Sequence, residues 1–107
     1  MSKYNEILVL HTMLTEAGIP HEITPFLGGY HICYPSQKDV VCSVIEHDGS
    51  YGRDCDLLEI MGLLTAEEEE CDSVLGYLTA IEVFRRIFKD SQRRGLTDPT
   101  KCAIIKL

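Results

Sequence analysis

The stretch that most restricts the fold is Val40-Val41-Cys42-Ser43-Val44-Ile45, followed at once by Glu46-His47-Asp48-Gly49-Ser50-Tyr51-Gly52-Arg53-Asp54. The first part is rich in β-branched residues, and residues 40–47 are therefore predicted to form a strand. Because the run is almost continuously apolar, it is typical of a central strand that is covered on both faces. The second part is polar and contains two glycines, which predicts a loop at the carboxyl end of that strand.

A helix is predicted before this strand, over residues 3–17. Its apolar residues recur at the spacing of one helical face, Ser2 is placed to cap it, and Gly18 is placed to end it. This helix is expected to cover one face of the sheet, which leaves the other face to later helices or to a partner subunit.

A β-hairpin is predicted between the helix and the central strand. Gly28-Gly29 can supply the positive φ angles of a two-residue turn between strands over residues 21–27 and 30–34. In that register Leu27 opposes Tyr30 and Pro25 opposes Ile32, so the apolar side chains share one face, which is expected to pack on the helix.

Helices are predicted to dominate the second half of the chain. Asp56 can cap a short helix that runs through Met61. Thr65 with Glu68, and Thr79 with Glu82, match the capping-box pattern that begins a helix. A final strand is predicted over residues 102–107. The sequence thus predicts one α+β domain over residues 1–107, with an N-terminal helix, a small antiparallel sheet of three to four strands, and C-terminal helices, in a homo-oligomer.

The charge of the chain limits its partners. The 107 residues carry a formal net charge of −7, which disfavours general binding to nucleic acid. The charge is uneven: residues 1–82 hold three basic and fifteen acidic residues, whereas residues 83–107 hold seven basic and two acidic residues. The basic segment is therefore the expected place for an anion.

The five cysteines include no closely spaced pair, so free thiols are expected rather than a disulfide framework or a structural zinc site. Cys33 and Cys42 could nevertheless face each other across a hairpin.

The candidate binding residues come from the polar loop and from the basic segment. A loop at the end of a central strand is a common place to bind a polar small molecule. Arginine and lysine side chains hold phosphates through charge and fork geometry. The predicted ligand-binding residues are His47, Ser50, Tyr51, Arg53, Arg85, Arg86 and Lys89, with the first three on a base or ribose and the cations on phosphates.

Other interpretations of the same residues stay open. The loop can be an elaborate surface turn, and the basic segment can pair with the acidic run over residues 67–70 of a neighbour. His47 with Ser50 or Cys55 resembles a base and a nucleophile, and His47 lies among acidic residues that can bind metals, but neither set has a recognisable catalytic or metal-ligand spacing. We therefore predict no catalytic residues, no metal and no cofactor.

Several phrases of the sequence resemble small proteins encoded by phages and prophages of Firmicutes. These phrases are Ile45-Glu46-His47 through Gly49-Ser50-Tyr51-Gly52, Leu57-Leu58-Glu59-Ile60-Met61-Gly62-Leu63-Leu64, Gly76-Tyr77-Leu78-Thr79-Ala80 and Val83-Phe84-Arg85-Arg86-Ile87. The resemblance covers about the central half of the chain and implies a context rather than residue roles. Small phage proteins of this kind often counter host defences by sequestering a nucleotide signal or by blocking a defence protein.

The charge, the lack of a catalytic spacing and the resemblance together predict a non-enzymatic, anti-defence viral protein. Residues 1–6 lack the apolar region of a signal peptide, and no apolar run approaches the roughly 18 residues of a membrane span, so we expect the protein in the cytoplasm of the bacterial host cell, without membrane contact. The first hypothesis is that it sequesters a phosphate-bearing small molecule, such as a cyclic nucleotide immune signal, without cleaving it. The alternative is a protein–protein inhibitor of a host defence complex, of the anti-CRISPR type, which presents the acidic run over residues 67–70.

Overall fold

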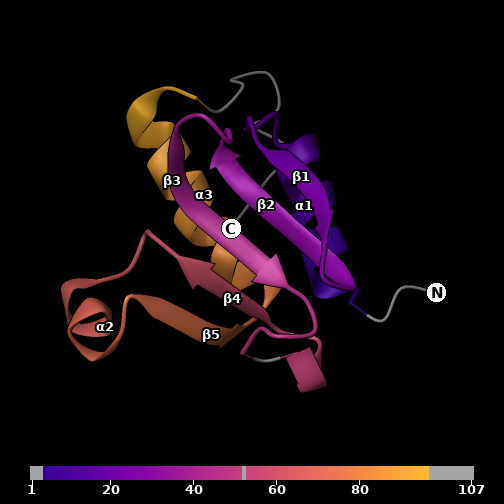
Figure 1. Ribbon diagram of the computed structural model, residues 1–107. Coiled ribbons are helices and arrows are strands. Elements are labelled where there is room, and N and C mark those ends of the chain that lie inside the picture. The colour runs from indigo at the N-terminus through magenta and orange to yellow at the C-terminus, as the bar shows by residue number, and fades with distance from the viewer. Residues whose placement is uncertain (1–3, 52, 97–107) are drawn as a thin grey trace.

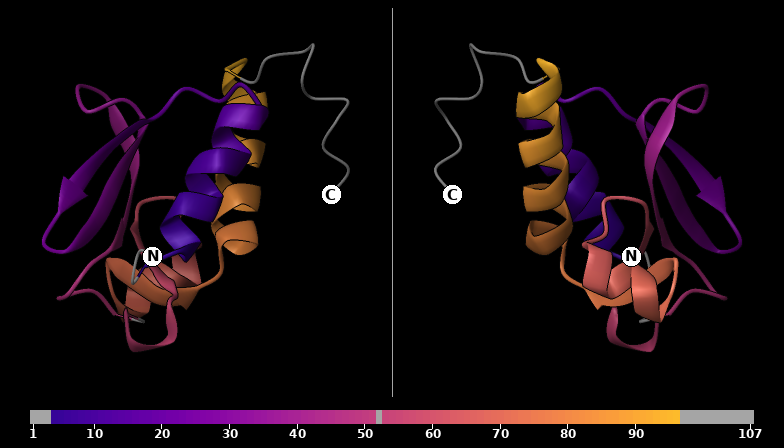
Figure 2. Two further views of the ribbon diagram at one scale, coloured as in Figure 1. Left: turned by 90° about the vertical axis from the view of Figure 1, so that its right-hand side faces the viewer. Right: turned by 90° about the vertical axis from the view of Figure 1, so that its left-hand side faces the viewer.

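In a computed structural model, residues 4–51 and 53–96 form a five-stranded antiparallel sheet with two long helices against one of its faces (Figures 1 and 2). The predicted α+β class is confirmed, with one or two more strands than expected. The elements in chain order are α1 (Glu6–Glu16), β1 (Glu22–Phe26), β2 (Gly29–Pro35), β3 (Val40–Glu46), the short 3-10 helix η1 (Arg53–Cys55), β4 (Leu58–Met61), α2 (Ala66–Cys71), β5 (Val74–Leu78) and α3 (Ala80–Arg94).

The strands pair in the order of the chain, β1-β2-β3-β4-β5, so β3 is the central strand, as its sequence predicts. Ile32 pairs with Val44, and Val44 pairs with Ile60, which places one apolar row across three strands. The alternate residues of β3, including Ser43, point to the other face. Helices α1 and α3 both cover the first face, so among the described residues the later helices do not cover the second face of β3 (Figure 2). Its cover by a partner subunit stays a prediction.

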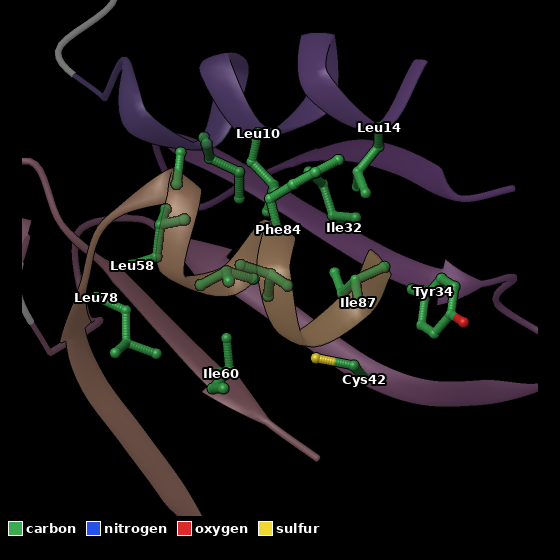
Figure 3. Packing of buried hydrophobic residues seen from close by; sticks show 14 of the residues in the cluster. Leu10, Leu14, Ile32, Tyr34, Cys42, Leu58, Ile60, Leu78, Phe84 and Ile87 are labelled. Carbon is green, nitrogen blue, oxygen red and sulfur yellow. The ribbon is translucent and has the colours of Figure 1, made fainter. Parts of the chain in front are cut away.

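The core lies between the sheet and the two helices (Figure 3). Leu10 and Leu14 point down from α1, and Phe84 and Ile87 point from α3 toward the same sheet residues. All four side chains are fully buried. The opposite face of the sheet, called here the open face, carries neither of the two long helices that the structure describes.

The hairpin between β1 and β2 turns one residue earlier than the sequence predicts. Leu27 and Gly28 have φ angles of 46° and 82° and form the turn, while Gly29 begins β2 and pairs with Phe26. A Cβ on Gly29 would lie 1.8 Å from the carbonyl oxygen of Glu46. Because β2 and β3 approach so closely here, only glycine fits at this position. Pro25 therefore pairs with Tyr30, two residues from its predicted partner, and each side chain keeps its predicted face.

The region after η1 also differs from its prediction. Residues 58–61 form strand β4 instead of a helix, because pairing with β3 satisfies their backbone groups and buries Leu58 and Ile60. Helix α1 begins at Glu6, three residues after the predicted start. Ser2 and the strand predicted over residues 102–107 lie outside the described residues.

Both predicted capping boxes are confirmed. The Thr65 side chain accepts from the Glu68 amide and the Thr79 side chain accepts from the Glu82 amide, while each glutamate bonds back to the threonine amide. The two similar phrases of sequence therefore begin α2 and α3. No helix within the described ranges has the length and apolar character needed to cross a membrane.

Candidate functional site

The seven predicted site residues do not form one site. His47, Ser50, Tyr51 and Arg53 belong to the connection between β3 and β4, whereas the other three lie on α3. His47 contacts Phe26, a residue of the open face, with ring centroids 5.1 Å apart. Helix α3 lies behind the opposite face of the sheet (Figures 1 and 2). The sheet therefore separates the described side chains of the loop from those of α3, and within one chain they do not line one pocket.

His47 and Ser50 stabilise the turn that contains them. The Ser50 hydroxyl donates to the His47 carbonyl oxygen over 2.9 Å and accepts from the His47 amide over 3.0 Å. His47 Nδ1 accepts from the Gly49 amide over 3.0 Å. Both residues are buried, so their polar atoms support the backbone and are poorly placed to contact a ligand.

Tyr51 is exposed and lies at the edge of the open face. Its amide donates to Glu59 Oε1 over 3.0 Å, and a Cβ on Gly76 would approach the Tyr51 Cβ to 2.6 Å. Tyr51 therefore lies across β5. Arg53 begins η1, and its side chain is outside the described part of the structure.

Arg86 is held by contacts within the chain. Its Nη1 donates to Glu68 Oε1 over 2.8 Å and to the Leu63 carbonyl oxygen over 2.9 Å, and its Nη2 donates to Glu68 Oε2 over 2.7 Å. The guanidinium group of arginine has about five N–H donors, so some remain for a ligand. The basic segment thus pairs with the acidic run inside one chain, in addition to any contact between chains.

The last basic residues of α3 surround a buried aspartate. Asp90 Oδ1 accepts from Arg93 over 2.6 Å, and Oδ2 accepts from Arg94 and from the Tyr34 hydroxyl, each over 2.7 Å. Burial and the bond to Asp90 raise the pKa of Tyr34, so the phenol remains a neutral donor. Asp90 thereby offsets part of the positive charge expected from the sequence.

A groove of about 680 Å³ lies between α3 and the segment that leads into α2. Two leucines form its apolar part, and three cations with one aspartate form its charged part. The lining residues are Leu63, Leu64, Thr65, Arg86, Lys89, Asp90 and Arg93. Arg86 and Lys89 are predicted site residues that lie together here, whereas Arg85 is exposed on the same helix and does not line the groove.

Two carboxyl groups that the sequence analysis did not select as site residues, those of Glu46 and Asp56, accept hydrogen bonds from amides at the start of α1. Glu46 is fully buried, and burial, followed by a hydrogen bond with the Asp56 side chain, raises the pKa of Glu46 to about 8. A signal for this residue exists in the sequence, because Glu46 continues the inward-facing alternation of Cys42 and Val44. Since solvent does not reach its carboxyl group, Glu46 is not placed to contact a substrate.

The open face carries a thiol, an imidazole and a hydroxyl group in contact. His31 Nε2 lies 2.6 Å from Ser43 Oγ and 3.4 Å from Cys33 Sγ. Burial raises the pKa of the Cys33 thiol, and nearby Glu22 raises it further, so the thiol is a weak nucleophile. Within residues 4–51 and 53–96, no three His, Cys, Asp or Glu side chains are grouped so that they could hold a metal ion.

The groove along α3 is therefore the best candidate for a binding site. Comparison of the chain with protein-family models, with curated proteins and with solved structures finds no match.

Proposed function

We propose that this protein binds a phosphate-bearing small molecule in the groove along α3 and holds it without cleaving it. The observation that carries the proposal is the combination of Arg86, Lys89 and Arg93 with two leucines in one groove of a chain whose net charge is −7. Cations gathered in one place on an acidic protein attract an anion to that place.

The two parts of the groove suit the two parts of a nucleotide. Lys89 has no ion-pair partner among the described residues, so its ammonium group is available to a phosphate. Arg86 is already held in place by Glu68, which lowers the entropy cost of adding a ligand to its remaining donors. Leu63 and Leu64 provide an apolar surface against which a base or a ribose can pack.

Binding without cleavage is supported by the chemistry of the lining. Hydrolysis of a phosphate ester needs a general base, a nucleophile or a metal beside the phosphorus. Both oxygens of Asp90 accept hydrogen bonds from the protein, and the Thr65 hydroxyl oxygen accepts from the Glu68 amide. Asp90 and Thr65 are thus engaged in bonds within the protein, which favours binding of a ligand over its hydrolysis.

Sequestration of a cyclic nucleotide immune signal in the bacterial cytoplasm is the role that the phage-like phrases favour. We further propose that the protein acts as a homo-oligomer, because the open face exposes Phe26 and Met61, at 47% and 55% of their surface. Such residues on an open sheet are a candidate contact between subunits.

A thermal-shift screen against linear and cyclic di- and trinucleotides tests the proposed binding. A ligand at 100 times its dissociation constant adds about 2.7 kcal/mol of stability, which raises the melting temperature of a small domain by several degrees. Chromatography of the ligand after incubation should recover it intact. No shift with any nucleotide would contradict the proposal, and conversion of the ligand would show an enzyme.

A matched pair of charge-reversal variants locates the site. Lys89→Glu places a negative charge in the groove and should abolish the shift. Arg85→Glu makes the same change on the same helix outside the groove and should retain most of it. Equal losses in the two variants would indicate that overall charge, and not the groove, determines binding.

The exposed carboxylates of α2 favour a second candidate, the protein–protein inhibitor. Helix α2 buries none of its residues and projects from the body at the connection between β4 and β5 (Figure 1). Glu67, Glu69 and Glu70 are exposed and have no ion-pair partner among the described residues. A Glu69→Lys and Glu70→Lys double variant should abolish inhibition of a defence complex while leaving nucleotide binding unchanged.

A further inference from the structure

The amino end of α1 is capped by side chains from a distant part of the chain. The first amides of a helix lack partners within the helix, and the Asn5 side chain at the N-cap position makes no bond to them. Asp56 Oδ1 accepts instead from the Asn5 amide over 2.8 Å and from the Glu6 amide over 3.1 Å. Glu46 Oε1 accepts from the Ile7 amide over 3.1 Å. Two carboxyl groups from either end of the β3–β4 connection thus hold one helix end.

These two carboxyl groups lie side by side, because they accept from the consecutive Glu6 and Ile7 amides. Glu46 is fully buried, and its second oxygen, Oε2, has no donor to accept from. A buried carboxyl oxygen without a donor, beside a second carboxyl group, favours a proton on one of the two groups. Asp56 already accepts from two amides, which favours its ionised form, and the proton therefore lies on Glu46.

The other charged groups around Glu46 do not replace this proton. Glu6, on α1, is acidic and directs its carboxylate to the Ala80 amide at the start of α3. Tyr4, before α1, donates to Asp48 Oδ1 over 2.6 Å, which adds another carboxylate to this end of the molecule. His47, the first residue after β3, contacts Phe26 of the open face. Among the described side chains, no lysine or arginine pairs with Glu46 or Asp56.

We infer that Glu46 and Asp56 share a single proton that fastens the amino end of α1 to the β3–β4 connection, and that loss of this proton releases that end. Because Glu6 links the start of α1 to the start of α3, the release also loosens the first turn of α3. Protonation of the pair thus controls how firmly the start of α1 is attached to the sheet, at a place separate from the proposed groove.

The direction of the pH effect follows from the two groups. The raised pKa of Glu46 means that the folded protein keeps a proton that the unfolded chain releases as the pH rises above the ordinary value of 4.5. Stability from Glu46 is therefore full below pH 4.5 and is lost as the pH rises to about 8. The pKa of Asp56 is lowered by its bonds to Glu46 and to the Glu6 and Asn5 amides, against burial, so its contribution is lost only in acid.

Urea unfolding of the full chain between pH 5 and pH 8.5 tests the inference. The unfolding equilibrium constant of the unmodified protein should rise by up to about tenfold per pH unit over this range, the effect of one proton. Glu46→Gln keeps an acceptor for the Ile7 amide and a donor for Asp56, so it should remove most of this rise. Glu59→Gln is the control, since Glu59 also accepts from a backbone amide but is only half-buried, and it should keep the rise. The same slope in Glu46→Gln as in the unmodified protein would overturn the inference.

A titration followed by NMR makes the test independent of the stability of Glu46→Gln. In the unmodified protein, the amide resonances of Asn5, Glu6 and Ile7 should shift together with a midpoint near pH 8. Asp56→Asn replaces the carboxylate by a group that can donate to Glu46, so the midpoint should fall by more than one pH unit. Amides that do not titrate, or a midpoint unchanged in Asp56→Asn, would show that no proton is shared.

Discussion

The guanidinium group of Arg86 on α3 donates two parallel hydrogen bonds, of 2.8 and 2.7 Å, to the carboxylate of Glu68 on α2. It also donates to the Leu63 carbonyl oxygen. Helix α2 buries no residue of its own, so this contact is its main attachment to the body among the interactions of the described residues. Arg86→Gln should lower the free energy of unfolding by about 1 kcal/mol, because both side chains are three-quarters buried and the bonding is bidentate.

Urea denaturation measures this loss. Arg85→Gln on the same helix is the control, and it should change stability by less than about 0.5 kcal/mol because Arg85 is exposed. Equal losses of unfolding free energy in the two variants would contradict the proposed role of Arg86 in attaching α2.

The same pair predicts a loss of stability in acid. The hydrogen bonds from Arg86, aided by those from Thr65, lower the pKa of Glu68 to about 2. Because the folded pKa is below the ordinary value of 4.5, the contribution of Glu68 is complete above pH 4.5 and is lost as the pH falls toward 2. Melting temperatures at pH 7, 4 and 2.5 should therefore fall less steeply for Arg86→Gln than for the unmodified protein. An equal fall of the melting temperature with pH in the two proteins would show that carboxylates other than Glu68 cause the loss of stability in acid.

Gly29→Ala should be the more damaging of two glycine substitutions. The added Cβ would lie 1.8 Å from the Glu46 carbonyl oxygen, so β2 and β3 would have to separate at a cost of about 3 kcal/mol or more. Gly95→Ala is the comparison, since Gly95 has a φ of +71° but no atom within 4 Å of the new Cβ. Backbone strain alone should cost about 1 kcal/mol there. Circular dichroism during urea unfolding measures both, and similar losses would disprove the close contact.

The described cysteines should stay reduced and differ in reactivity. Cys33 lies on the open face and pairs with Ser43, whereas Cys42 pairs with Tyr34 and points into the core, so the two cannot face each other as the sequence allowed. A thiol reagent followed by peptide mapping should modify the exposed Cys55 and Cys71 quickly, and Cys33 and Cys42 only on unfolding. Rapid labelling of Cys42 in the folded protein would contradict the packing of the core.

Local sequence signals predicted much of the fold. The capping boxes at Thr65 and Thr79 involve neighbouring residues only, so the sequence alone was sufficient to place them. Strands β4 and β5 were missed because short apolar runs such as residues 57–61 suit a strand or a helix equally. Only pairing with β3 decides between the two, and that pairing is a property of the whole sheet.

The site was harder to predict than the fold. Nothing in the sequence shows that the sheet lies between His47 and Lys89, because that separation depends on which face α3 covers. The partner of Arg86 was similarly hidden, since Glu68 is 18 residues away and reaches it only through the path of β5. The positive charge of α3 was correctly placed, but the groove that uses it is formed by tertiary packing.

The distant capping of α1 has a consequence for how the chain is made. The groups that satisfy the first amides of this helix come 39 to 51 residues later in the sequence. A nascent chain emerging from the ribosome therefore holds α1 without its cap until Asp56 has been synthesised. Helix α1 is therefore capped only after the three strands that follow it in the sequence, β1, β2 and β3, have been synthesised.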